Sequence, residues 1–168
     1  MSEIGAYEII LEALQKYSLK TEYKDEEHDL QPELEKLIKK TLSKEGLEEY
    51  QVKVSLGGKN KPRVDLLGTN LWPNIEISND GQPIIAIEVK YTKSLPAAIS
   101  STLGQCLIYK LKYDHVIGFI FYNGKKMNAK FNDYNEPFWE MVSGLDIALI
   151  IRVNESLEAL HPYLKIQK

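Results

Sequence analysis

The stretch Ile84-Ile85-Ala86-Ile87-Glu88-Val89-Lys90 decides the fold of this chain. Its nearly continuous apolar run, rich in β-branched residues, is typical of a strand that is buried on both faces of a sheet. Two charged residues, Glu88 and Lys90, interrupt the run two positions apart. Because side chains alternate along a strand, both are expected to lie on one face. Burying unpaired charges is costly, so the two residues form either an ion pair at the end of a strand or part of a functional site.

Length and composition indicate one soluble globular domain over residues 1–168. The chain is 43% hydrophobic and 27% charged, which is ordinary for such a domain. No apolar run approaches the roughly 20 residues that span a bilayer, and we expect no membrane partner. The first residues show no secretory signal, and the single Cys106 cannot form an intrachain disulfide, so a cytoplasmic location is expected. Cys106 lies within a predicted helix and is expected to be a small core residue.

Charge is distributed unevenly, although the formal net charge is only -3. Residues 1–50 hold 13 acidic residues and 7 lysines, whereas residues 90–130 hold 7 lysines and a single acidic residue, Asp114. A local basic surface can bind a phosphate backbone even in a protein that is acidic overall. Lysines that merely decorate a solvated surface are the alternative. The candidates for phosphate contacts are Lys93, Lys110, Lys112, Lys125 and Lys126.

Periodicity predicts an α/β domain with the element order α-α-β-β-β-α-β-α-β-α. Residues 70–82 contain Trp72-Pro73-Asn74 and are predicted to be an irregular loop in which Glu76 is solvated, with a short strand within it as the alternative. In the third helix, the residues Ile99, Leu103, Leu107 and Leu111 are predicted to share one buried stripe. The predicted helices span 3–18, 27–45, 94–113, 135–142 and a last segment capped by Asn154; the predicted strands span 50–54, 62–68, 84–91, 116–122 and 145–153.

Acidic residues near the central strand suggest a metal site. In a β-meander, adjacent strands can bring Asp65 beside Glu88, and carboxylate oxygens are the ligands that Mg²⁺ or Mn²⁺ prefers. Such a metal polarises a phosphate and activates a water molecule, while Lys90 can orient that water or stabilise developing charge. Glu27 lies on the edge of the buried stripe of the second helix and could supply a further ligand; Glu33 competes for this role from a different face.

These residues carry a resemblance to a known superfamily. Asp65 followed by Glu88-Val89-Lys90 resembles the PD-(D/E)xK motif of restriction-endonuclease-like nucleases, with the Pro-Asp pair loosened to Pro62-Arg63-Val64-Asp65. The segment from Gln105 to Tyr109 is similar to the Gln-x-x-x-Tyr motif of the helicase-associated exonuclease branch. The resemblance implies a restriction-endonuclease-like core over about 27–122, a mixed β-sheet with helices on both faces, and elaborations at both ends.

The resemblance also implies an activity, namely Mg²⁺-dependent hydrolysis of DNA phosphodiester bonds, with Mn²⁺ as a substitute. Asp65, Glu88 and the main-chain carbonyl of Val89 would hold the metal, Lys90 would act on the water or the phosphate, and Glu27 would be an accessory carboxylate. The implied substrate contacts are Gln105, Tyr109 and Lys93.

The sequence is also compatible with other functions and arrangements. A superfamily member that has lost catalysis would instead bind nucleic acid or protein, and RNA remains open as a substrate. A homodimer is one expected arrangement, because cutting both strands of a duplex needs two sites. Trp72 and Tyr91 could stack on bases, with half-buried packing as the alternative.

Overall fold

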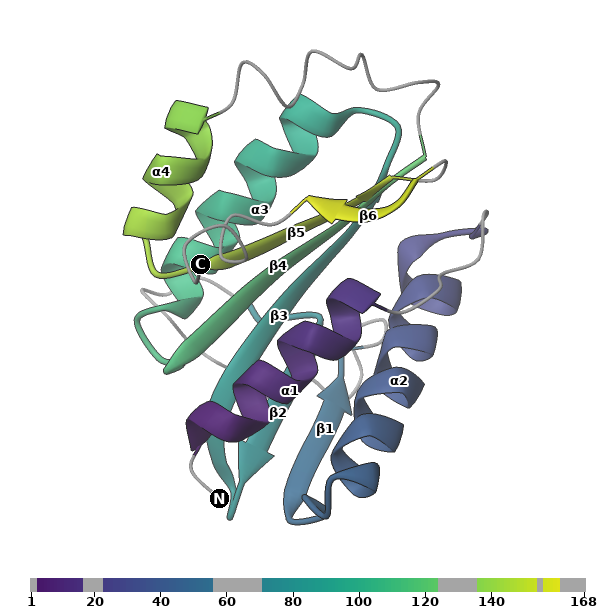
Figure 1. The fold of residues 1–168 in the computed structure, drawn as a ribbon, viewed down its shortest axis with the longest axis vertical. Coiled ribbons are helices and arrows are strands. Elements are labelled where there is room, and N and C mark those ends of the chain that lie inside the picture. Colours follow the sequence, from purple (N-terminus) through teal and green to yellow (C-terminus); the bar gives the residue numbers. More distant parts are fainter. Residues whose placement is uncertain (1–2, 17–22, 56–70, 124–135, 154–155, 161–168) are drawn as a thin grey trace.

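The computed structural model describes residues 3–16, 23–55, 71–123, 136–153 and 156–160. Six strands form one sheet in which their spatial order, β1-β2-β3-β4-β5-β6, equals their order along the chain (Figure 1). The strands are β1 (Tyr50–Val54), β2 (Ile75–Asn79), β3 (Gln82–Thr92), β4 (His115–Tyr122), β5 (Ala148–Val153) and β6 (Ser156–Leu160). The helices are α1 (Glu3–Lys16), the π-helical turn η1 (Glu26–Leu30), α2 (Gln31–Lys44), α3 (Leu95–Tyr109) and α4 (Glu136–Gly144).

The sheet is mixed. Strands β1, β2 and β3 form an antiparallel meander, β3, β4 and β5 run parallel, and β6 returns antiparallel to β5. Helix α3 connects β3 to β4, and α4 lies between β4 and β5 along the chain, as parallel pairing requires. The longest strand, β3, therefore has a neighbour on each side and lies in the interior of the sheet.

Helices cover both faces of the sheet. Helices α1 and α2 pack on the face that carries Ile85, Ile87 and Val89, while α3 packs on the opposite face over Ala86 (Figure 1). Helix α4 lies beside α3 on that second face. The two covered faces explain why β3 is almost continuously apolar. The predicted α/β class, with a mixed sheet between helices, is confirmed.

Strand β2 confirms the alternative of a short strand within residues 70–82, so the predicted irregular loop is wrong for residues 75–79. These residues pair with β1 and β3, with a register shift between Ile77 and Ser78, and Glu76 is buried rather than solvated. The charge of Glu76 led to the prediction of a solvated loop, because a carboxylate in an apolar segment argues against burial unless its partner is known. That partner, Tyr113, lies 37 residues away in the sequence.

The end of the chain is a second difference. A helix capped by Asn154 was predicted, and this is wrong, because Ser156–Leu160 form β6, paired antiparallel with β5. Pairing with β6 satisfies backbone groups of β5 that would otherwise lie at the edge of the sheet. The predicted strand at 62–68 lies outside the described residues.

Helix α3 is buried along a different stripe from the predicted one. Its buried residues are Leu95, Ala98, Thr102, Leu103, Cys106 and Tyr109. Leu107 is 44% exposed, and Leu111, which follows the helix, is 63% exposed, so the predicted stripe is wrong beyond Leu103. Cys106 is fully buried, as expected of a core residue. With 15 residues, α3 is the longest described helix, and no helix in the described ranges could cross a membrane.

Candidate active site

Glu88 and Lys90 point to the α3 face of the sheet, as alternation along β3 predicts. Their side chains form an ion pair with 2.8 Å between the Lys90 Nζ and the Glu88 Oε1. The Glu88 side chain is only 2% exposed, whereas that of Lys90 is 25% exposed. The carboxylate is therefore part of the core, and the ammonium group reaches from it toward solvent.

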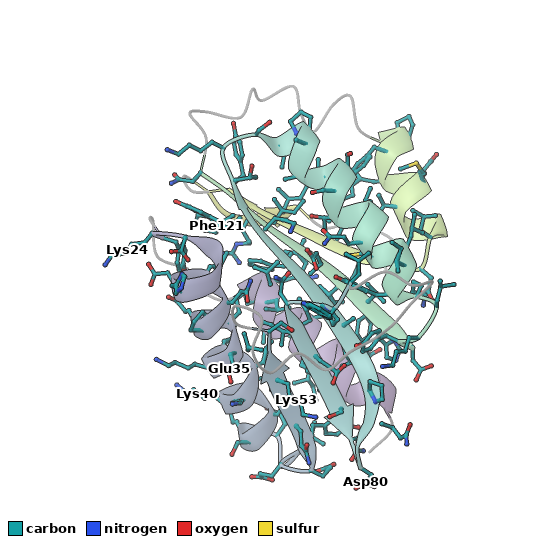
Figure 2. The ribbon with its side chains drawn as sticks, turned by 180° about the vertical axis from the view of Figure 1, so that it is seen from behind. Lys24, Glu35, Lys40, Lys53, Asp80 and Phe121 are labelled. Atoms are coloured by element: carbon teal, nitrogen blue, oxygen red, sulfur yellow. The ribbon has the colours of Figure 1, made fainter. Side chains whose placement is uncertain are left out.

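The pair lies in the carboxyl-terminal half of β3. Lys90 and Tyr91 are aligned with Ile120 and Phe121 of the parallel strand β4. Figure 2 shows Phe121 far from Asp80, which lies in the turn between β2 and β3. Phe121 lies instead on the side of Lys24, the residue two positions before η1. Ligand sites of open α/β sheets lie at the carboxyl ends of parallel strands, and this pair lies toward that end.

Tyr109 of α3 donates a hydrogen bond to the Glu88 carboxylate. Its hydroxyl lies 3.0 Å from the Glu88 Oε2 and 2.8 Å from the main-chain oxygen of Trp72, so one proton is shared between two acceptors. Burial raises the pKa of the Tyr109 hydroxyl well above its ordinary value, and the charge and hydrogen bond of Glu88 raise it further. The neutral phenol therefore remains a donor at neutral pH.

The burial of Tyr109 bears on its predicted role in substrate binding. The side chain is 0% exposed, so in this conformation it contacts Glu88 and Trp72 rather than a substrate. Gln105, one turn earlier on the same helix, is half-buried. Of this motif, Gln105 is therefore the side chain with surface available for a substrate.

Gly118 brings α3 close enough to the sheet for the Tyr109 contact. It is aligned with Glu88 on the neighbouring strand β4. A Cβ atom at Gly118 would lie 2.7 Å from the Thr102 Cγ2 and 3.0 Å from the Leu149 Cδ1. Distances this short are not tolerated in a packed core, so a side chain here would displace α3.

A second tyrosine–carboxylate pair lies beside the first. The Tyr113 hydroxyl, four residues after Tyr109, donates to the Glu76 Oε2 at 2.5 Å. Burial, followed by the hydrogen bond to Glu76 and its charge, raises the pKa of the Tyr113 hydroxyl. Tyr109, at the end of α3, and Tyr113, four residues later, thus donate hydrogen bonds to buried carboxylates on β3 and β2.

Cys106 lies near the same carboxylate but is not a candidate nucleophile. Burial raises the pKa of its thiol, the charge of Glu88 raises it further, and that of Lys90 opposes this effect. The reactive form of cysteine is the thiolate. A buried, neutral thiol therefore contributes packing rather than chemistry.

Asn74 is a residue of this region that the sequence analysis missed. Its Oδ1 accepts a hydrogen bond of 2.6 Å from the main-chain N–H of Val89, the residue between Glu88 and Lys90. The signal was present in the sequence as Trp72-Pro73-Asn74 directly before a β-branched segment. This pattern alone does not reveal the contact, because Val89 lies 15 residues further along the chain.

The structure does not place all of the predicted site residues. Asp65 lies outside the described residues, as do Lys125 and Lys126. The backbone of Glu27 lies in η1, which contacts β3, but its side chain is likewise outside the description. Lys93 is exposed just after β3.

Glu33, the alternative to Glu27, has a tyrosine partner. Its Oε1 accepts a hydrogen bond of 3.1 Å from the Tyr23 hydroxyl. The Tyr23 ring packs against Tyr91 and Phe121, in the core on the other face of the sheet from Glu88.

Other predicted contact residues have structural partners. The Lys110 Nζ lies 2.7 Å from the Asp146 Oδ2, and the Lys112 Nζ lies 5.7 Å from the centre of the Tyr113 ring. The Tyr91 hydroxyl accepts a hydrogen bond from Asn123, and its ring packs in the core. The observed contacts of Tyr91 are those of a half-buried packing residue, which was the alternative to stacking on bases.

The oxygen atoms near Glu88 are of the kind that a hard divalent cation prefers, namely the Glu88 carboxylate and the main-chain carbonyl of Val89. Among the described residues, no group of three or more His, Cys, Asp or Glu side chains is arranged to hold a metal ion. The described donor set therefore fits Mg²⁺ in chemical type but supplies one carboxylate. The candidates for a second carboxylate are Asp65, Glu27 and Glu33.

Replacing Tyr109 with phenylalanine is expected to lower the free energy of unfolding by about 1–3 kcal/mol, because two buried acceptors lose their shared donor. Urea denaturation measures this change. Tyr122→Phe, at a half-buried tyrosine of β4, is the matched control, with an expected change within about 0.5 kcal/mol. Equal destabilisation by both variants would contradict the contact between Tyr109 and Glu88.

Comparison of the chain with protein-family models, with curated proteins and with solved structures finds no match.

Proposed function

We propose that this chain is a metal-dependent nuclease that hydrolyses phosphodiester bonds in DNA. The observation that carries the proposal is the buried Glu88 carboxylate joined to the partly exposed Lys90 ammonium on one face of an interior strand. A carboxylate in this position supplies a metal ligand, and an ammonium beside it supplies positive charge for a phosphate. Further support comes from the element order α2-β1-β2-β3-α3-β4, which is the order that the resemblance implies, although the strand paired with β3 is β2 (Ile75–Asn79) and not the predicted strand 62–68 that carries Asp65.

Each residue has a distinct role in this proposal. Glu88, Asp65 and the main-chain carbonyl of Val89 would hold Mg²⁺, with Mn²⁺ as a substitute, and Glu27 would be an accessory carboxylate. When bound, the metal would polarise the phosphate and lower the pKa of a water molecule. Lys90 would stabilise the charge that develops on the phosphate, while Gln105 and Lys93 would contact the substrate.

Pro73 gives a physical reason why the Val89 carbonyl could serve as a ligand. The last aligned pair at this end of β2 and β3 is Ile75 with Ile87, and continuing the alignment would place Pro73 opposite Val89. Proline has no N–H, so it cannot donate to the Val89 carbonyl as a ladder residue would.

A cleavage assay tests the proposal. Plasmid, single-stranded and branched DNA, with an RNA arm, are incubated with the protein in Mg²⁺ or Mn²⁺. We expect cleavage by the wild type and a loss of at least about 100-fold in Asp65→Ala and Glu88→Gln. Asp114→Ala, at an exposed acidic residue, is the control and should cleave normally. Cleavage that survives both site substitutions would overturn the assignment.

A second candidate function, binding without cutting, is favoured by one observation. Both oxygens of the Glu88 carboxylate already have partners, Lys90 and Tyr109, and the side chain is nearly inaccessible. Such an ion pair can be purely structural. Calorimetry separates the two functions, because retained DNA binding together with no Mg²⁺ or Mn²⁺ binding would favour a binding module. Size-exclusion chromatography with and without duplex DNA tests the proposed homodimer.

A further inference from the structure

Strands β2 and β3 lose their regular pairing next to the ion pair. The last aligned pair at this end is Ile75 with Ile87, and continuing the alignment places Asn74 opposite Glu88 and Pro73 opposite Val89. The Pro73 carbonyl is used elsewhere, because it accepts a hydrogen bond of 2.9 Å from the Ser55 hydroxyl. The Val89 N–H therefore donates to another acceptor and not to this main-chain carbonyl.

Asn74 provides this acceptor through its side chain. Its Oδ1 lies 2.6 Å from the Val89 nitrogen, and its main-chain carbonyl accepts a hydrogen bond of 2.9 Å from the N–H of Ser55. Asn74 thus joins the end of β1 to β3 at the point where the β2 ladder stops. A buried N–H left without an acceptor would cost about 1–3 kcal/mol, so the contact is required in energetic terms.

Asn74 holds the N–H of Val89, the residue between the two charged residues. This N–H belongs to the Glu88–Val89 peptide unit, so the hydrogen bond restrains the backbone from which the Glu88 and Lys90 side chains extend. Trp72 lies two residues before Asn74, and its main-chain oxygen accepts a hydrogen bond from the Tyr109 hydroxyl, which also donates to Glu88. The segment 72–74 therefore contacts the pair in two ways, directly at Val89 and through Tyr109.

The amide is also suited to the charge of this region. An aspartate would offer a similar acceptor but would add a second negative charge opposite Glu88. Asparagine accepts the same hydrogen bond while remaining neutral.

We infer that Asn74 is a positioning residue of the Glu88–Lys90 site, which orients the Val89 peptide through its side-chain oxygen. The effect on cleavage rests on the proposed nuclease function, whereas the effect on the Val89 peptide does not. The two can therefore be measured separately.

The test compares Asn74→Ala, Asn74→Asp and the control Asn79→Ala, which changes an asparagine at the other end of β2. Amide hydrogen exchange, followed by NMR, should be at least about 10-fold faster at Val89 in Asn74→Ala, with Ile85 unchanged. Asn74→Asp retains an acceptor and should retain the protection of Val89. Exchange at Val89 that is unchanged in Asn74→Ala, or accelerated as much in Asn79→Ala, would overturn the inference.

Cleavage kinetics separate positioning from a purely structural role. Asn74→Ala should lower kcat by about 10- to 100-fold with KM within about 2-fold, because misplacing reacting groups by a fraction of an ångström slows chemistry. Asn74→Asp should restore most of kcat. Kinetics of Asn74→Ala that match those of Asn79→Ala would refute positioning. A wild-type protein that cuts no substrate would refute the nuclease proposal, while exchange at Val89 would still decide whether Asn74 holds the peptide.

Discussion

Lys90→Met is expected to abolish DNA cleavage, with a loss of at least about 100-fold, and to lower the free energy of unfolding by about 3 kcal/mol. The rate falls because the charge that would stabilise the phosphate is removed. The stability falls because Glu88, whose side chain is 2% exposed, loses the ammonium group at 2.8 Å. A buried carboxylate without its cation is the costly half of a broken ion pair. Urea denaturation and the plasmid assay measure the two effects.

A double variant distinguishes the two roles of this pair. Glu88→Gln combined with Lys90→Met removes both charges while keeping the side chains similar in size, so it should recover most of the lost stability. It should not recover cleavage, because neither the metal ligand nor the cation is present. Lys93→Met, at an exposed lysine three residues on, is the control for stability. If Lys90→Met were no more destabilising than Lys93→Met, the ion pair would contribute nothing to the fold.

Arg152→Met is expected to lower the free energy of unfolding by about 3 kcal/mol while leaving the environment of Glu88 unchanged. Arg152 lies on β5, is 3% exposed, and donates to the main-chain oxygens of Leu14, at 3.5 Å, and Gln15. These carbonyls belong to the last turn of α1, where a helix leaves acceptors unsatisfied and where a cation is favourable. Methionine would fill part of the volume but would leave these carbonyls without their donor.

The same helix end supplies a matched control. Lys16 is also a cation in the last turn of α1, but its side chain is 73% exposed and its ion pair with Glu12 lies at the surface. Lys16→Met should therefore change stability by no more than about 0.5 kcal/mol. Burial lowers the pKa of Arg152, which reflects the cost of placing a charge in the core. Similar effects of the two variants would show that the buried cation does not hold α1 to the sheet.

Some errors of the sequence analysis have a geometric cause. The predicted stripe of α3 used residues four apart, and four residues advance about 40° beyond one full turn of an α-helix. Over the three steps from Ile99 to Leu111, such a stripe rotates away from the sheet by roughly a third of a turn. Leu107 and Leu111 are exposed for this reason, and Cys106 and Tyr109 take the buried positions.

Other errors concern partners that are distant in the sequence. Glu76 was predicted to be solvated because its burial depends on Tyr113, which lies 37 residues away. Asn74 was overlooked because its role depends on the alignment of β2 with β3. None of these contacts leaves a local pattern, since a five-residue segment carries little periodicity of its own.

The sequence by itself determined that residues 84–90 form a buried strand and that Glu88 and Lys90 share one face. Strand alternation is a property of the backbone, so it holds whatever the neighbours are. Only the tertiary structure decided what surrounds the pair. Tyr109 reaches Glu88 because Gly118 lets α3 approach the sheet, and Asn74 reaches Val89 at the point where the pairing of β2 with β3 stops. These contacts depend on the distance between a helix and a sheet and on strand register, which are set by packing across the whole core.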